Sequence, residues 1–175
     1  VKVYQYSGTD KKVLAETPVN ADHSYSLSVP VEKAGDAVVD CGGWQAVDVW
    51  LEDENMDIDF RGLDTAKIKI KNPPYVYIRA GKKNELMNLV NFHAYRSYQT
   101  MIAISQNVYK AKIEDQKKSQ QLAMSLYDAS GEDSDAWMRY LTEHYSDLTS
   151  VLVPLSRLDE EKDADIINAA LAKLE

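Results

Sequence analysis

The sequence predicts an α+β protein, with an N-terminal antiparallel β-sandwich or meander followed by a C-terminal helical module. Before Asn72-Pro73-Pro74, apolar and polar residues alternate, which is the period of half-buried strands. Beyond it, apolar residues recur every three to four positions, which is the period of helices. No helical segment separates one strand candidate from the next, and this favours antiparallel pairing. We therefore expect a β module at 1–72, a connector at 73–83 and a helical module at 84–175.

Six or seven short strands are expected in the β module, separated by clusters of turn residues such as Ser7–Asp10 and Gly42-Gly43. The segment Ser24–Val29 alternates most strictly, with three apolar side chains on one face and three serines on the other. The candidates are 1–6, 12–19, 24–29, 36–41, 44–52, 56–60 and 67–71.

One long helix and several short ones are expected in the helical module. Asn84 is a candidate N-cap, and an apolar stripe at i+4 steps follows it. The helical pattern persists to Asp128, although an uninterrupted helix of that length would be unusual, so a break between Tyr109 and Asp115 is the alternative. We expect a loop at 129–133 and a second N-cap at Ser134. Two further helices are expected, around Leu148–Leu155, which Pro154 interrupts, and at Asp163–Lys173.

Composition excludes several classes of partner. The chain has 175 residues, a net charge of −8 and a pI near 4.9. Nucleic acid and anionic membrane surfaces both require clustered Lys and Arg, so neither is an expected partner. No apolar run approaches the ~20 residues of a transmembrane helix. Because Val1 opens inside a strand candidate and is not Met, we expect the chain to come from a longer protein with any export signal upstream.

Cys41 is the single cysteine, so no internal disulfide, C-x-x-C motif or cysteine-rich zinc site can form. It shares a predicted strand face with Ala37 and Val39. Since free cysteines are usually buried, we interpret Cys41 as a small buried hydrophobe.

The densest acidic stretch is Glu52–Asp59, and carboxylate oxygens are the ligands that Ca²⁺ prefers. A calcium loop starting at Asp57 would have Gly62 at position 6, but Arg61 and Ile68 occupy positions that need oxygen ligands. We therefore expect a hairpin turn with its acidic face in water.

The other sequence motifs of catalysis are missing. The three histidines, His23, His93 and His144, have no metal-binding spacing, and neither a P-loop nor a G-x-S-x-G motif occurs. We predict no catalytic, cofactor-binding or metal-binding residues.

Trp44 and Trp50 share one face of a strand candidate, with Val47, Val49 and Leu51 on the other face. If the aliphatic face is the core, the tryptophans face outward, where they pack on the helical module, bind a ligand or meet a partner. We favour packing on the helices and predict that Trp44 or Trp50 contacts residues beyond position 84.

Three segments carry a resemblance to a known family. They are Val1–Tyr6 followed by Thr17–Leu27, then Leu51–Gly62 leading to Asn84–Asn88, and finally Tyr140–Leu158 with the closing short helix that ends at Lys173-Leu174. In this order they resemble the N-terminal domain of uncharacterised function in Bacteroidetes thiol:disulfide oxidoreductases, where it precedes a thioredoxin-like domain of the TlpA or AhpC/TSA type. The family usually begins with one more strand. Its redox C-x-x-C lies in the thioredoxin-like domain, which would follow Glu175, so no redox residue is carried over.

The resemblance implies a non-catalytic accessory domain of an exported thiol:disulfide oxidoreductase, periplasmic or anchored as a lipoprotein. Its roles would be positioning the redox domain, recognising client proteins or dimerising. The alternative is a free-standing extracytoplasmic module that binds carbohydrate or peptide through exposed aromatics. An enzyme that uses the carboxylates of Glu52–Asp59 is a third and weaker hypothesis.

Overall fold

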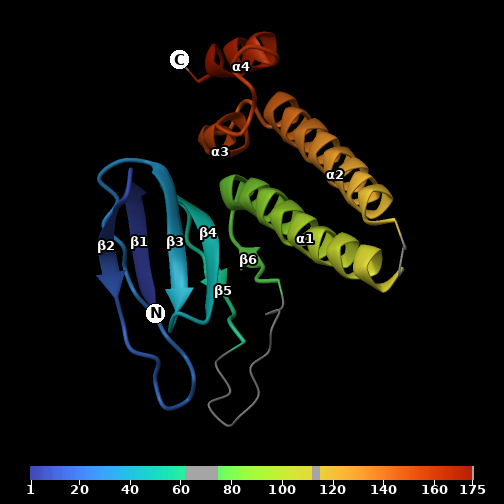
Figure 1. The fold of residues 1–175 in the computed structure, drawn as a ribbon. Coiled ribbons are helices and arrows are strands. Elements are labelled where there is room, and N and C mark those ends of the chain that lie inside the picture. The colour runs from blue at the N-terminus through green and yellow to red at the C-terminus, as the bar shows by residue number, and fades with distance from the viewer. Residues whose placement is uncertain (62–74, 112–114, 175) are drawn as a thin grey trace. The chain divides into compact units, whose positions relative to one another are not determined.

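The computed structural model describes residues 1–61, 75–111 and 115–174, and it confirms an α+β fold (Figure 1). A four-stranded antiparallel sheet comes first in the chain, and helices follow. The chain divides into two compact units, Val1–Asn88 and Leu89–Glu175. The boundary between the two units falls inside the first long helix.

Two hairpins form the main sheet of the first unit. Its strands are β1 (Lys2–Ser7), β2 (Asp10–Glu16), β3 (Gly35–Cys41) and β4 (Gln45–Leu51). The spatial order is β2-β1-β3-β4, with every neighbouring pair antiparallel. In a meander the strands would follow one another in chain order, so the expected meander is wrong. Gly42 and Gly43, with φ of 68° and 69°, make the β3–β4 turn in the left-handed region that glycine favours.

A second, two-stranded antiparallel sheet consists of β5 (Asp57–Ile58) and β6 (Ile78–Arg79). Among the described residues it is too small to form the second layer of a sandwich. Alternate residues of the strands supply the buried core of this unit, including Val3, Val39, Val47, Val49 and Ile78.

The predicted strand at Ser24–Val29 is wrong, because this segment has no strand pairing. Its alternation nevertheless reports burial, since Tyr25, Leu27 and Val29 are half-buried and the serines are exposed. The Tyr25 hydroxyl donates a hydrogen bond of 2.6 Å to the Ile58 carbonyl. Packing on one side therefore produces the alternating sequence of a strand, without the backbone hydrogen bonds to a neighbouring strand. The expected strand at 67–71 lies outside the described residues.

Two long helices replace the single long one expected. They are α1 (Lys82–Lys110) and α2 (Gln116–His144), so the alternative of a break between Tyr109 and Asp115 is confirmed. Asp115 caps α2, because its carboxylate accepts hydrogen bonds from the backbone N–H groups of Lys117 and Lys118. The expected loop at 129–133 is wrong, since these residues lie inside α2. Ser134 is therefore not an N-cap.

Short helices close the second unit: the 3₁₀-helix η1 (Thr149–Val151), α3 (Leu152–Leu155) and α4 (Ala164–Leu171). The helix α3 has a single turn that contains Pro154, and α4 confirms the predicted last helix. Arg139 of α2 pairs with Asp163 at the start of α4, with 2.6 Å between Nε and the carboxylate. The Arg139 guanidinium holds the pKa of the Asp163 carboxyl below its usual value. This ion pair therefore stabilises the contact between α2 and α4.

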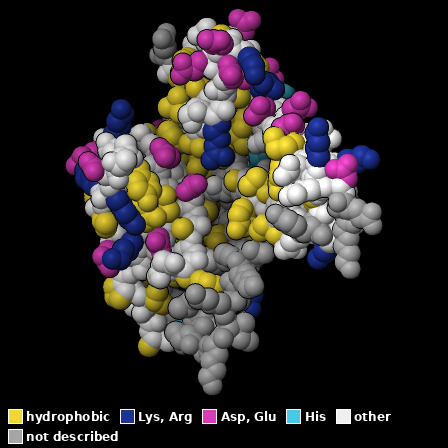
Figure 2. Space-filling model, in the orientation of Figure 1, with side chains coloured by type: hydrophobic (Ala, Val, Ile, Leu, Met, Phe, Trp, Pro, Cys, Tyr) yellow, Lys and Arg dark blue, Asp and Glu magenta, His cyan; other side chains and the backbone are white. Residues whose placement is uncertain are grey.

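The surface carries both signs of charge. On the face shown in Figure 2, acidic and basic side chains are interspersed, with hydrophobic side chains exposed between them. Among the described residues, no helix is both long and apolar enough to span a membrane.

Candidate functional site

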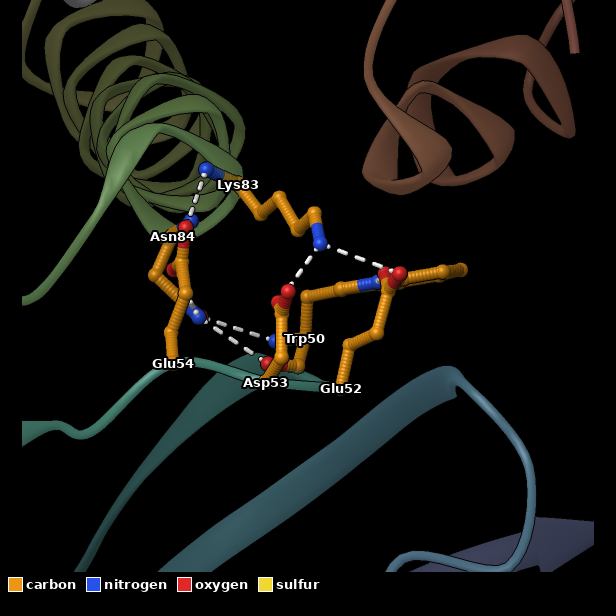
Figure 3. A network of polar contacts seen from close by, with 6 residues as sticks. All are labelled: Trp50, Glu52, Asp53, Glu54, Lys83 and Asn84. Carbon is orange, nitrogen blue, oxygen red and sulfur yellow. Dashed lines mark hydrogen bonds and ion pairs between the residues drawn. The ribbon is translucent and has the colours of Figure 1, made fainter.

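The acidic run that begins at Glu52 lies against the first turn of α1 (Figure 3). The Glu54 carboxylate accepts hydrogen bonds from the backbone N–H groups of Lys83, at 2.9 Å, and Asn84, at 3.1 Å. These N–H groups have no partner within the helix, and the helix dipole favours an anion beside them. Glu54 therefore caps a helix that begins well beyond it in the chain.

Asn84 is not the N-cap that the sequence predicts. It lies inside the first turn of α1 and is fully buried. Its side-chain oxygen accepts a hydrogen bond from the Trp50 N–H at 2.8 Å, and its side-chain nitrogen donates to the Trp50 carbonyl at 2.9 Å. Strand β4 is an edge of the main sheet. The Asn84 amide thus pairs with an edge strand as a neighbouring strand would.

Asn88 repeats this contact one turn later. Its amide accepts from the Ile78 N–H at 2.9 Å and donates to the Ile78 carbonyl at 2.8 Å. The two asparagines are four residues apart and so lie on the same helix face. Together they attach the start of α1 to both β4 and β6, and we call them the asparagine clamps.

Lys83 completes the network. Its ammonium lies 3.0 Å from a Glu52 carboxylate oxygen and 2.6 Å from an Asp53 oxygen. The hydrogen bond to Asp53, followed by that to Glu52, raises the pKa of Lys83. Glu52 also accepts a hydrogen bond from the Trp50 indole N–H at 2.8 Å. These carboxylates therefore serve to attach the helix.

The alternative of an exposed tryptophan ligand surface is wrong for Trp50. Its side chain is only 3% exposed and its backbone is paired with Asn84, at the first position of the predicted helical module. Trp44 is half-buried. Neither tryptophan is therefore fully exposed, and full exposure of both was the observation that would have favoured a ligand surface.

Among the described residues, the other candidate side chains are not gathered into a site. Asp57 and Asp59 both pair with Arg79 at exposed positions, 3.2 Å and 2.9 Å away. Within the described ranges, no group of three His, Cys, Asp or Glu side chains could hold a metal ion, and Gly62 and Ile68 of the calcium frame lie outside these ranges. Cys41 is half-buried at the end of β3 instead of fully buried.

His93 is the histidine with the most structured surroundings. It is 7% exposed on α1, and its Nε2 lies 3.0 Å from the Ser134 hydroxyl and 3.2 Å from the Ser97 hydroxyl. Burial lowers the pKa of His93, so the neutral imidazole is favoured. His23 lies in an exposed turn with φ of 68°.

A ladder of aromatic rings extends from His93 along α2. Ring centroids are 6.1 Å apart for His93 and Trp137, 5.4 Å for Trp137 and Tyr140, and 4.0 Å for Tyr140 and His144. The planes of each pair are within 26° of parallel. Spacings of three and four residues place the α2 rings one above another on a single face.

An open groove of about 310 Å³ lies against this ladder, inside the second unit. Phe92 and Tyr140 line it and are 47% and 45% exposed. Arg96 and Asp133 place opposite charges in its lining. We call it the aromatic groove. This groove is not among the sequence predictions, although the helical spacing of Trp137, Tyr140 and His144 indicates that their rings share a face.

Comparisons of the chain with protein families, with curated proteins and with solved structures found no match. The resemblance to thiol:disulfide oxidoreductases therefore stays a prediction from the sequence.

Proposed function

We propose that this chain is the non-catalytic accessory domain of an exported thiol:disulfide oxidoreductase and that it recognises client polypeptides. The observation that carries client recognition is the aromatic groove of the second unit. The association with a thioredoxin-like domain rests on the resemblance of the three sequence segments. The alternative, a free-standing binding module, would use the same groove.

The size and lining of the groove suit a polypeptide side chain. Its volume of about 310 Å³ is at the small end of ligand pockets, large enough for one or two side chains. Exposed aromatic rings such as Phe92 contribute large contact areas in recognition sites. Arg96 and Asp133 offer a donor and an acceptor to the peptide backbone beside that side chain.

The ring ladder favours peptide over carbohydrate. A sugar stacks on the open face of an aromatic ring. Trp137 precedes Tyr140 by three residues and His144 follows it by four, and both stack on it. These rings flank Tyr140 on either side along the helix, so the exposed part of Tyr140 is its edge and hydroxyl. Such an edge suits hydrogen bonding and side-chain packing.

The roles of the acidic residues support a non-catalytic assignment. Glu54 is occupied by backbone N–H groups of α1, and Glu52 and Asp53 by Lys83. A general acid or base needs a carboxyl that can reach a substrate proton. These contacts hold a helix, and substituting them should affect folding before any chemistry.

Titration with unfolded, cysteine-containing polypeptides, followed by tryptophan fluorescence, tests the proposal, because Trp137 lines the groove. We expect Phe92→Ala and Tyr140→Ala each to weaken binding roughly fivefold or more, the effect of losing about 1 kcal/mol at an interface. Tyr98→Ala is the matched control, since Tyr98 is a 55% exposed aromatic of α1 outside the groove lining. Equal effects at Phe92 and Tyr98 would refute recognition by the groove.

Two further measurements separate the alternatives. The gene sequence beyond Glu175 should encode a thioredoxin-like domain with a C-x-x-C motif, and a stop codon there would contradict the accessory role. A glycan panel in the same fluorescence assay should give no response. Glycan binding that is lost in Tyr140→Ala would replace the client hypothesis with the carbohydrate-binding alternative.

A further inference from the structure

We propose that the outer face of α2 is a self-complementary surface through which two copies of this chain pair in antiparallel orientation. This inference does not rest on the proposed function, since it concerns another partner, although the surface shares Asp133 with the lining of the aromatic groove. The surface, which we call the α2 stripe, consists of Lys118, Leu122, Ser125, Leu126, Ala129 and Asp133. Steps of three and four residues place all six on one helix face.

The α2 stripe is exposed along its whole length. Leu122 and Leu126, one helical turn apart on this face, are 43% and 40% exposed. The face of α2 that contacts α1 is a different one, marked by Ser134 with its contact to His93. Buried residues of α2 begin only at Met138, so α3 and α4 leave the stripe uncovered.

The order of residues in the stripe matches the requirement of a two-fold axis. Lys118 and Asp133 lie equally far from the midpoint between Ser125 and Leu126, and so do Leu122 and Ala129. In an antiparallel pair centred there, Lys118 of each copy faces Asp133 of the other, and Leu122 faces Ala129. A two-fold interface uses the same patch on both copies and must be complementary to itself in this way.

The pairing gives the interface two charged ends and a mainly apolar centre, where the Ser125 hydroxyl is already bonded to the Gln121 carbonyl of its own helix at 3.0 Å. A leucine opposite an alanine lets helices approach closely, while ion pairs at the rim fix register and orientation. From Lys118 to Asp133 the stripe is roughly 22 Å long at 1.5 Å per residue. This is short for a dimer interface, so we expect a weak dimer, with a Kd of roughly 10 μM to 1 mM.

Exchanging the charges at the two ends tests the inference. Sedimentation equilibrium measures self-association of the whole chain at concentrations up to about 1 mM, the upper limit of the expected Kd. Lys118→Glu and Asp133→Lys place like charges at both ends of the dimer, and each should weaken self-association roughly tenfold or more. The double variant K118E/D133K restores opposite charges and should regain most of the affinity. The matched control K117E/D135K makes the same exchange on another face of α2 and should change nothing.

Cross-linking locates the axis independently. In a Cys41→Ser background, Ser125→Cys places a thiol beside the two-fold axis and should form a disulfide dimer on mild oxidation. Gln120→Cys, an exposed position off the stripe, should not. Asp133 also lines the aromatic groove, whereas Lys118 does not. Loss of dimer in Lys118→Glu with unchanged peptide binding therefore separates this inference from the proposed function.

Three outcomes would overturn the inference. The first is a chain that stays monomeric at about 1 mM, which would mean that another part of the protein or another partner covers the stripe. The second is a double variant K118E/D133K as weak as the single variants. The third is equal cross-linking of Ser125→Cys and Gln120→Cys.

Discussion

The asparagine clamp at Asn84 gives the most direct test of how α1 is attached. Replacing Asn84 with Ala removes both hydrogen bonds to the Trp50 backbone and a third, of 2.9 Å, to the Glu54 carboxylate. The strand partner β3 lies on the other side of β4, so it cannot replace them. Asn84 is fully buried and Trp50 is 3% exposed. The variant therefore leaves a buried N–H and a buried carbonyl unpaired.

The size of the effect follows from these two groups. Each buried polar group that loses its partner costs about 1–3 kcal/mol, so the pair costs about 2–6 kcal/mol. A water molecule entering the vacated space would restore part of this energy. We therefore expect a loss of about 2–4 kcal/mol in the stability of the first unit.

Hydrogen exchange of the Trp50 amide is the appropriate assay, because the two units need not unfold together. A loss of about 2 kcal/mol corresponds to exchange roughly thirtyfold faster. Asn107→Ala is the matched control, an exposed asparagine of the same helix, and it should shift stability by about 0.5 kcal/mol or less. If Asn84→Ala resembles Asn107→Ala and the Trp50 amide stays protected, the clamp does not hold β4.

Four other substitutions test single contacts. Glu54→Ala should lower the free energy of unfolding by about 1 kcal/mol, because α1 loses its cap. Gly81→Ala should lower it by a similar amount, because the new Cβ would collide with the Glu54 carboxylate. Urea unfolding measures both changes. Because the pKa of His93 is lowered in the folded state, the stability that the neutral imidazole contributes should fall as pH drops below about 6.5, and His93→Gln should abolish that slope in thermal unfolding. The pKa of Asp163 is also lowered in the folded state, so the stability that its carboxylate contributes is present above about pH 4 and is lost as pH falls through the folded-state pKa. Asp163→Asn should destabilise the second unit at neutral pH, because it weakens the pair with Arg139.

Periodicity predicted those elements in which local and tertiary preferences agree. The strands at 1–6, 36–41 and 44–52 have their apolar face on the core, and they formed with small shifts in their ends. It failed at Ser24–Val29, where one-sided burial produces alternation without a ladder. It failed again at 129–133, because one glycine costs a helix only about 1 kcal/mol and α2 continues through Gly131.

The polar network could not be predicted from local sequence. Asn84 stands just before an apolar stripe, as an N-cap would, and only the position of β4 shows that its amide pairs with Trp50. The acidic run likewise predicts a solvated turn. Nothing near Glu54 in the chain indicates that its carboxylate caps α1. Contacts between residues about thirty positions apart depend on topology, which periodicity does not specify.

The two units differ in how much of their polar and aromatic chemistry is already used by the fold. In the first unit, the conspicuous groups are bonded internally: the clamps to strand backbones, Glu54 to α1 and Trp50 to Glu52. In the second unit, Phe92 and Tyr140 remain about half exposed in a groove, and Leu122 and Leu126 remain exposed on the α2 stripe. Exposed apolar surface is where a partner gains the most binding energy. Substitutions in the first unit should therefore act on stability, whereas substitutions of these four side chains should act on binding.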